Sequence, residues 1–315
     1  MGVFNTPLLF LIFNRPDTTK QVFDEIRKLK PKFLYLAADG PRSNLEGETK
    51  KCQLTQQIVL ENIDWDCQVA TLIRDENLGC GKAVSEAITW FFSHVEEGII
   101  LEDDCLPDAS FFPFCSELLE RYRSNQKVMT ISGSNLLGKP WKSETQSYFC
   151  GHGGIWGWAT WKRAWTLYDS KMTGWSDSGC KELIRANIKT NEWYKFYYHM
   201  FESSFNGSLD TWDVQWFYTI LINNALGINP SVNLVKNIGF NNNATHTSSN
   251  QNFLKKLKLT SIALPLIHPK ILEVDTEYLK LMYKAVTSQN KTWVSLSKER
   301  LKNLYQFLFK NLNKW

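Results

Sequence analysis

The sequence has no apolar run long enough to cross a membrane and no paired cysteine motif. Its first apolar stretch, residues 7–13, is short and ends at an Asn-Arg-Pro step, so it predicts a core strand rather than a signal peptide or a membrane span. The seven cysteines are odd in number and include no CxxC pair. This argues against a zinc site and a disulfide framework, and favours a reducing, cytoplasmic compartment.

Excess charge is lacking as well. A net charge of +4 over 315 residues is too small to argue for nucleic-acid binding, so no nucleic-acid partner is expected. Hydrophobic content of 43% and charged content of 22% are ordinary for a folded protein of one or two domains. Aromatic residues are abundant instead: 13 Trp, 11 Tyr and 19 Phe either stack on flat ligands such as sugars and bases or fill the core.

Apolar periodicity predicts alternating strands and helices in the first third of the chain. The predicted strands cover residues 8–13, 33–37, 67–73 and 98–101, and the predicted helices cover residues 17–29, 49–62 and 82–94. This alternation predicts an α/β fold with a mostly parallel sheet flanked by helices. Residues 1–252 are expected to form the main domain, and residues 253–315 a helical, basic C-terminal extension.

An acidic triplet, Glu102-Asp103-Asp104, directly follows the predicted strand at residues 98–101. Open α/β sheets bind their ligands where the strands leave the core at their carboxyl ends. Three crowded carboxylates cost free energy unless a cation or hydrogen-bond donors offset them. A divalent metal that carries a phosphate-containing ligand is the natural partner, and a solvated acidic turn is the alternative.

Two further charged residues follow predicted strands. Arg15 comes just after the first strand and Asp39 just after the second, so both are expected at the same sheet edge as Asp104. An Asp there can accept the imide N–H of a uracil, and an Arg can stack on the base or pair with a phosphate. Each residue alone is also compatible with an ordinary turn.

A glycine-containing loop, residues 74–82, follows the third strand and opens a helix. Its backbone N–H groups suit an anion, and Asn77, Gly79 and Lys82 are its candidate ligand contacts. The spacing is not that of a P-loop. A plain loop with a helix cap is the alternative.

Three later segments also offer chemistry. Residues 151–161 contain four Gly and three Trp, so Gly157 can bring the backbone close to a ligand and Trp158 can stack on a sugar. Asp213 lies just ahead of a predicted helix, where a carboxylate can act as a general base or merely cap the helix. His246 follows an Asn-rich stretch and either completes a metal's coordination shell or is simply exposed.

Taken together, these segments resemble a GT-A glycosyltransferase. Residues 99–112 are similar to the Glu-Asp-Asp segment of N-acetylglucosaminyltransferase I-like enzymes. Residues 13–16 and 38–40 resemble that group's base-binding Arg and Asp, and residues 157–161 resemble its Gly-Trp loop. The likeness covers roughly residues 7–247.

The resemblance implies a GT-A (Rossmann-like) fold and a UDP-sugar donor. It implies that Asp104 binds a Mn²⁺ or Mg²⁺ ion that bridges the diphosphate, while Glu102 and Asp103 hold the ribose and the metal's water shell. It also implies that Asp213 deprotonates the acceptor hydroxyl, with inversion at the anomeric carbon. Because Asp213 is not followed by a second acid as in the relatives, Asp210 is the reserve candidate.

The leading hypothesis is therefore an inverting, metal-dependent hexosyl- or N-acetylhexosaminyltransferase of bacterial surface-polysaccharide or glycan synthesis, with a glycan or lipid-linked acceptor. A sugar-phosphate nucleotidyltransferase is one alternative, although it is expected to carry a Gly-rich basic loop after the first strand. A non-catalytic sugar-binding or membrane-docked protein is the other. Residues 290–315 are predicted either to contact anionic lipid at the inner membrane face or to pack on the domain.

Overall fold

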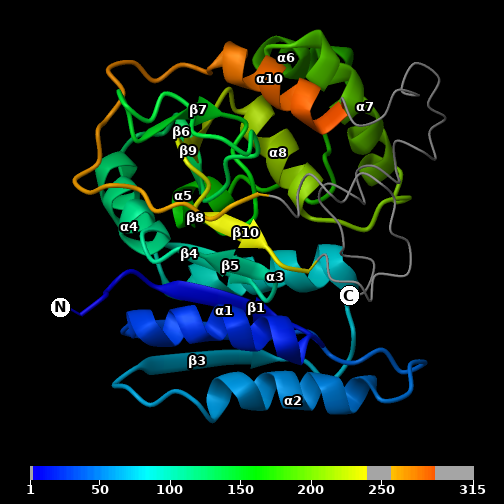
Figure 1. Cartoon of the computed structure of the whole chain (residues 1–315). Helices are drawn as coiled ribbons and strands as arrows, with labels where there is room; N and C mark the ends of the chain where they lie inside the picture. The colour runs from blue at the N-terminus through cyan, green and yellow to red at the C-terminus, as the bar shows by residue number, and fades with distance from the viewer. Residues whose placement is uncertain (1–2, 240–256, 288–315) are drawn as a thin grey trace.

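The computed structural model describes residues 3–239 and 257–287. Figure 1 shows an α/β architecture in which helices flank a central eight-stranded sheet. The predicted fold class, a mostly parallel sheet with flanking helices, is confirmed.

Helices and strands alternate along the first third of the chain. The first are β1 (Leu8–Ile12), α1 (Pro16–Leu29), β2 (Phe33–Ala38), α2 (Glu48–Leu60), β3 (Gln68–Ile73), α3 (Gly79–His94), β4 (Glu97–Glu102), β5 (Cys105–Pro107) and α4 (Phe111–Tyr122). Then come β6 (Val128–Ser132), β7 (Tyr148–Gly151), β8 (Trp158–Trp161), α5 (Lys162–Trp165), α6 (Ser178–Asn187), α7 (Asn191–Phe205), α8 (Asp213–Ile222), β9 (Leu226–Pro230), β10 (Val235–Asn237) and α10 (Thr276–Thr287).

The main sheet has the strand order β3-β2-β1-β4-β8-β6-β9-β7. Strands β3, β2, β1 and β4 are parallel, and β4 and β6 are both antiparallel to β8. Since β9 is parallel to β6 and antiparallel to β7, six of the eight strands point the same way and only β8 and β7 are reversed. A separate two-stranded sheet pairs β5 with β10.

Crossovers through helices explain how the first four strands are arranged. From β1 the chain moves outward through β2 to β3, and α1 and α2 pack against each other. It then returns through α3 to β4 on the other side of β1, and α3 contacts β1. The direction in which successive strands are added to the sheet therefore reverses between β1 and β4, although the two strands are parallel. Open α/β sheets bind their ligands at such a point.

The short strands in the middle of the chain were not predicted. The sequence predicts no strand between residues 139 and 180, but β7 and β8 lie there and are fully buried. Strand β8 is inserted between β4 and β6 in the centre of the sheet. Its aromatic residues therefore belong to the core of the protein.

The described part of the C-terminal extension contains one helix. Residues 257–275 contain no helix, and α10 is the helical portion of the described extension. The buried side chains of Leu257, Leu266, Tyr278 and Leu279 join the core cluster of the main domain. Residues 290–315, for which membrane contact is one alternative, lie outside the described residues. Within the part of the chain that the structure describes, no helix has the length and apolar character to cross a bilayer.

Candidate functional site

The predicted charged residues gather at the carboxyl ends of β1, β2 and β4. In the paired register, Leu11 of β1 lies beside Glu102 of β4, and the last residues of β1 and β2 are likewise neighbours. Asp39 directly follows β2, Arg15 comes three residues after β1, and the acidic triplet begins with the last residue of β4. The structure thus places them at the reversal point of the sheet.

Arg15 lies between two acids of the triplet. Its Nη1 atom is 2.8 Å from Asp104 Oδ2 and 3.4 Å from Asp103 Oδ1. The backbone N–H of Phe13 donates a second hydrogen bond to Asp103, at 3.1 Å. The Arg15 side chain is 19% exposed, whereas those of Asp103 and Asp104 are 0% and 5% exposed. The Arg15 side chain is therefore partly exposed, while the two acids that it pairs with are buried.

The three acids of the triplet outnumber the one cation that pairs with them, Arg15, and the pKa values of Glu102 and Asp103 are raised. Burial and the charges of Asp104, Asp103 and Asp213 raise the pKa of Glu102 well above its usual range. Burial raises the pKa of Asp103 to about 7, although Arg15 and the Phe13 N–H act in the opposite direction. A buried site with this charge balance is stabilised by added cations or hydrogen-bond donors.

Asp39 is buried and holds the glycine loop in place. Its two carboxylate oxygens accept hydrogen bonds from the N–H groups of Gly40 and Leu78 and from the side-chain amide of Asn77, at 2.8 to 3.2 Å. Burial raises the pKa of Asp39, and these donors oppose that shift. The predicted contact with a uracil N–H would have to replace one of these bonds, for example the one from Asn77.

Asp210, the reserve base, sits at the amino end of α3. Its Oδ1 accepts a hydrogen bond from the N–H of Gly81 at 3.0 Å, and a Cβ atom at Gly79 would lie 2.9 Å from its Oδ2. The carboxylate thus caps α3 from a distant part of the chain and occupies the anion position predicted for a ligand. Lys82 is exposed and lies 3.8 Å from Glu86, on the outer side of the helix.

The prediction that Trp158 stacks on a sugar is wrong. Its side chain is 0% exposed, because β8 lies between β4 and β6 in the sheet. Its ring stacks on Trp212, with centroids 5.5 Å apart, and also packs on Trp165 and Trp216. Gly157 has a positive φ of 58°, and a Cβ atom there would lie 2.7 Å from Val235, so this glycine serves close packing.

Asp213 is the first residue of α8 and is buried, with 6% of its surface exposed. The hydroxyl of Thr211 donates a hydrogen bond to its carboxylate. Its charge raises the pKa of Glu102, and it contributes with burial to raising the pKa of Tyr168 and Tyr197. Asp213 therefore lies within electrostatic reach of the acidic triplet, although the two are far apart in sequence.

A small cavity of about 60 Å³ has Asp213 in its wall. Its wall also includes Thr130, His152, Tyr197, Met282 and the glycines of the loop after β7. Sequence reasoning missed this cavity because its residues come from β6, α7, α8, α10 and two loops that are far apart in the sequence. The Oγ1 atom of Thr130 and the Nδ1 atom of His152 are both buried and have no hydrogen-bond partner among the described residues.

His152 is a neutral histidine at this wall. Its Nε2 lies 3.1 Å from the carbonyl oxygen of Ile188, so Nε2 carries the proton and Nδ1 is an acceptor. The ring packs against the uncharged rings of Trp193, Tyr197 and Phe217. Burial lowers the pKa of His152 to about 4.

The lowered pKa of His152 predicts a pH dependence of stability. Because the unfolded chain binds this proton at a higher pH than the folded chain, the free energy of unfolding falls as the pH drops from about 6.5 toward 4. Between pH 7 and pH 5 the wild type is expected to lose about 2 kcal/mol more than a His152→Gln variant. Urea denaturation at both pH values measures this difference; equal losses in the two proteins would contradict it.

The described residues do not complete a metal site by themselves. Within residues 3–239 and 257–287, no three His, Cys, Asp or Glu side chains are arranged to hold a metal ion. Asp103 accepts hydrogen bonds from Phe13 and Arg15, and Asp104 is also paired with Arg15, so a hard divalent cation at Asp104 would share this carboxylate with the guanidinium. The second predicted ligand, His246, lies outside the described residues.

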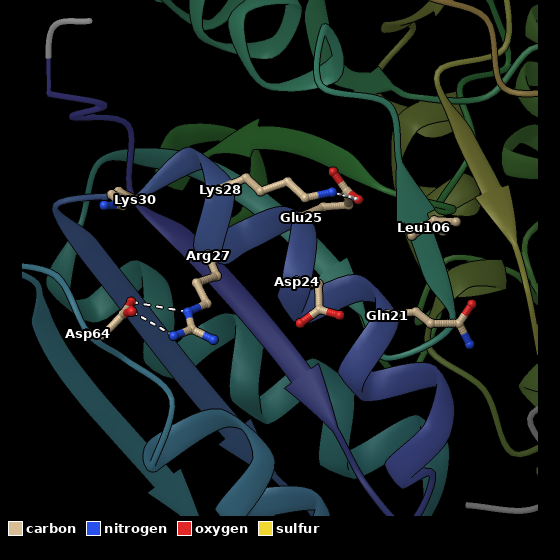
Figure 2. A pocket seen from close by; sticks show the side chains of 8 residues that line it. All are labelled: Gln21, Asp24, Glu25, Arg27, Lys28, Lys30, Asp64 and Leu106. Carbon is tan, nitrogen blue, oxygen red and sulfur yellow. Dashed lines mark hydrogen bonds and ion pairs between the residues drawn. The ribbon is translucent and has the colours of Figure 1, made fainter.

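A larger hollow on the surface is unrelated to this site. Figure 2 shows it along the outer side of α1, with a volume of about 560 Å³. Four of the charged groups that line it pair with one another: Arg27 with Asp64, and Lys28 with Glu25. Such exposed pairs are ordinary surface features, and nothing in the hollow indicates a ligand.

No family model and no curated protein matches this chain. Solved structures with partial similarity include the mannosyltransferase PcManGT from Pyrobaculum calidifontis in complex with GDP-Man and Mn²⁺ (11% identity, 50% of this chain and 45% of that chain, TM-score 0.32). HddC from Yersinia pseudotuberculosis has 11% identity over 50% of this chain and 77% of that chain, with a TM-score of 0.31. UDP-glucose pyrophosphorylase complexed with UDP-glucose has 10% identity over 47% of this chain and 64% of that chain, with a TM-score of 0.23.

This chain thus spans less than half the length of the mannosyltransferase and just under two thirds of the pyrophosphorylase. At these TM-scores the likeness carries no functional weight, and the function has to be inferred from the residues of the site.

Proposed function

We propose that this protein is an inverting, metal-dependent glycosyltransferase that moves a sugar from a UDP-sugar donor to an acceptor hydroxyl. The proposal includes Asp213 as the general base, and Arg15 and the acidic triplet as the diphosphate site. It extends to a glycan or lipid-linked acceptor of bacterial surface-polysaccharide synthesis at the cytoplasmic face of the membrane.

One observation carries this proposal: in addition to burial, the charge of Asp213, which is far away in sequence, raises the pKa of Glu102, the first acid of the triplet at the reversal point of the sheet. Asp104 is paired with Arg15, whose guanidinium is partly exposed and suits an anionic ligand. Asp213 also borders a cavity. These observations support an anion site with a base near it, as transfer from a nucleotide diphosphate requires.

The residues would act in the following way. As the acceptor oxygen forms its bond to the anomeric carbon, Asp213 takes the hydroxyl proton, and the bond from that carbon to the diphosphate oxygen breaks on the opposite face. Arg15 would hold the diphosphate. A divalent ion, held by Asp104 and the diphosphate, would supply positive charge for the departing UDP. The burial of Glu102 and Asp103 would exclude water from the same edge.

UDP binding provides the first test. The wild type is expected to bind UDP at least tenfold more tightly with Mn²⁺ than without it, because the ion offsets the charges of both the diphosphate and Asp104. Asp104→Asn is expected to lose this enhancement. Isothermal titration calorimetry measures it, with Asp64→Asn as a control because Asp64 pairs with Arg27 at the surface, in the hollow of Figure 2.

The outcomes separate the alternatives. Absence of UDP binding would contradict the transferase. UDP binding that is equal with and without Mn²⁺ in all three proteins would overturn the metal dependence and leave Arg15 as the diphosphate contact. A nucleotidyltransferase would release pyrophosphate from a nucleoside triphosphate and a sugar phosphate, whereas the proposed enzyme releases UDP from a UDP-sugar.

A further inference from the structure

The cavity beside Asp213 is too small for a sugar ring. At about 60 Å³ it has room for a few water molecules or for a single substituent of a larger ligand. Most of its wall is apolar, with contributions from Ile155, Val214, Phe217, Ile220 and Met282. The group that suits it must therefore be small and partly apolar.

Two residues of this wall, Thr130 and His152, carry buried polar atoms without partners in the described part of the chain, and these restrict the chemistry of the group. Thr130 is 1% exposed, and its hydroxyl has no partner within the described residues although it can donate a hydrogen bond. The Nδ1 atom of His152 is an acceptor, because Nε2 carries the proton that Ile188 accepts. A buried donor and a buried acceptor left unmatched each cost free energy. A plain methyl group would leave both unmatched.

An acetamido group has the complementary chemistry. Its carbonyl oxygen accepts a hydrogen bond, its N–H donates one, and its methyl group suits the apolar part of the wall. Asp213 borders the same cavity, and under the proposed function Asp213 contacts the acceptor hydroxyl. A group in this cavity therefore belongs to the acceptor.

We infer that the acceptor is an acetamido sugar, whose acetamido group occupies the cavity lined by Thr130, His152 and Asp213. This inference rests on the proposed function for its assignment to the acceptor. It narrows the acceptor to a sugar or glycan terminus with an N-acetylated amine next to the hydroxyl that is glycosylated.

The structure offers a matched pair of variants for the test. Thr130→Val removes the unpartnered hydroxyl at the cavity and keeps the side-chain shape. Thr19→Val does the same in α1, where Thr19 is 0% exposed and its hydroxyl is also without a partner among the described residues. Neither variant is expected to lower the thermal midpoint of the free protein, because each removes an unsatisfied buried polar atom.

The probes are the methyl glycosides of N-acetylglucosamine and N-acetylgalactosamine, compared with those of glucose and galactose. Binding to the full chain is measured by NMR titration in the presence of UDP and Mn²⁺. At least one acetamido glycoside is expected to bind about tenfold more tightly than its hydroxyl counterpart. Thr130→Val is expected to remove most of this preference, and Thr19→Val to keep it.

Several results would overturn the inference. One is equal binding of the acetamido and hydroxyl glycosides, and another is an equal effect of the two Val variants on the binding preference. A third is a preference that appears only between UDP-N-acetylglucosamine and UDP-glucose, which would assign the cavity to the donor. The proposed function fails separately. If UDP binds and no acetamido preference is found, only the inference fails; if the preference is found without UDP binding, the transferase fails and the acetamido site stands.

Discussion

Replacing Asp213 with Asn is expected to lower the rate of sugar transfer by about 10²- to 10⁴-fold, the usual contribution of a general base. The amide has nearly the same shape and can still accept a hydrogen bond from Thr211, so the fold should persist. It has no basic oxygen for the acceptor proton. Initial rates with saturating donor measure the loss, and UDP titration is expected to show unchanged donor affinity.

Two other aspartates serve as controls for this effect. Asp210 competes for the role of base, but its carboxylate caps α3 through Gly81; Asp210→Asn is expected to lower stability by about 1 kcal/mol and to retain most activity. Asp177 caps α6 through the N–H of Cys180, so Asp177→Asn reports the effect of changing a cap alone. If Asp210→Asn lost as much activity as Asp213→Asn, the assignment of the base would be contradicted.

The sheet edge is predictable because its signals are local. The apolar runs of β1, β2 and β4 and the helices between them are each visible in a few consecutive residues, and the crossover rule then makes these strands parallel neighbours. The meeting of Arg15 with Asp104 follows from that rule alone. This is why the charges of the candidate site could be brought together without a structure.

What escaped prediction depends on contacts between distant segments. Asp39 was expected to contact a base, yet its oxygens are occupied by Asn77 and Leu78, which precede α3. Asp210 was expected near the chemistry, yet it caps a helix that begins some 130 residues earlier in the chain. Nothing in the sequence around either Asp reveals its partner. A carboxylate at a strand end or before a helix has the same local pattern whether it binds a ligand or the protein itself.

The tryptophans illustrate the same limit for aromatic residues. Trp158, Trp212 and Trp216 all have buried ring N–H groups without partners in the described part of the chain, and the ring of Trp158 packs on the other two. Composition predicts stacking but does not distinguish stacking on a sugar from stacking in the core. The position of β8 in the middle of the sheet decides for the core, and this order appears only when the chain is folded.

Replacing Arg15 with Gln is expected to reduce the free energy of unfolding by about 3 kcal/mol or more, as is typical when one partner of a buried ion pair is removed. Asp103 and Asp104 would remain buried beside Glu102 without their guanidinium. Urea denaturation at neutral pH measures the loss. Arg123→Gln is the control: its side chain is 52% exposed and pairs with Glu97 and Glu120, so a cost below about 1 kcal/mol is expected.

Manganese is expected to restore part of the stability lost in Arg15→Gln, because an ion that binds only the folded chain stabilises it by mass action. Without Arg15 the Asp104 carboxylate loses its guanidinium partner, so the thermal midpoint should rise with Mn²⁺ concentration by several degrees. The double variant Arg15→Gln/Asp104→Asn should show no such rise. If Mn²⁺ stabilised both variants equally, Asp104 would not be the metal ligand; if it stabilised neither, the acids at the end of β4 would bind the donor through Arg15 alone.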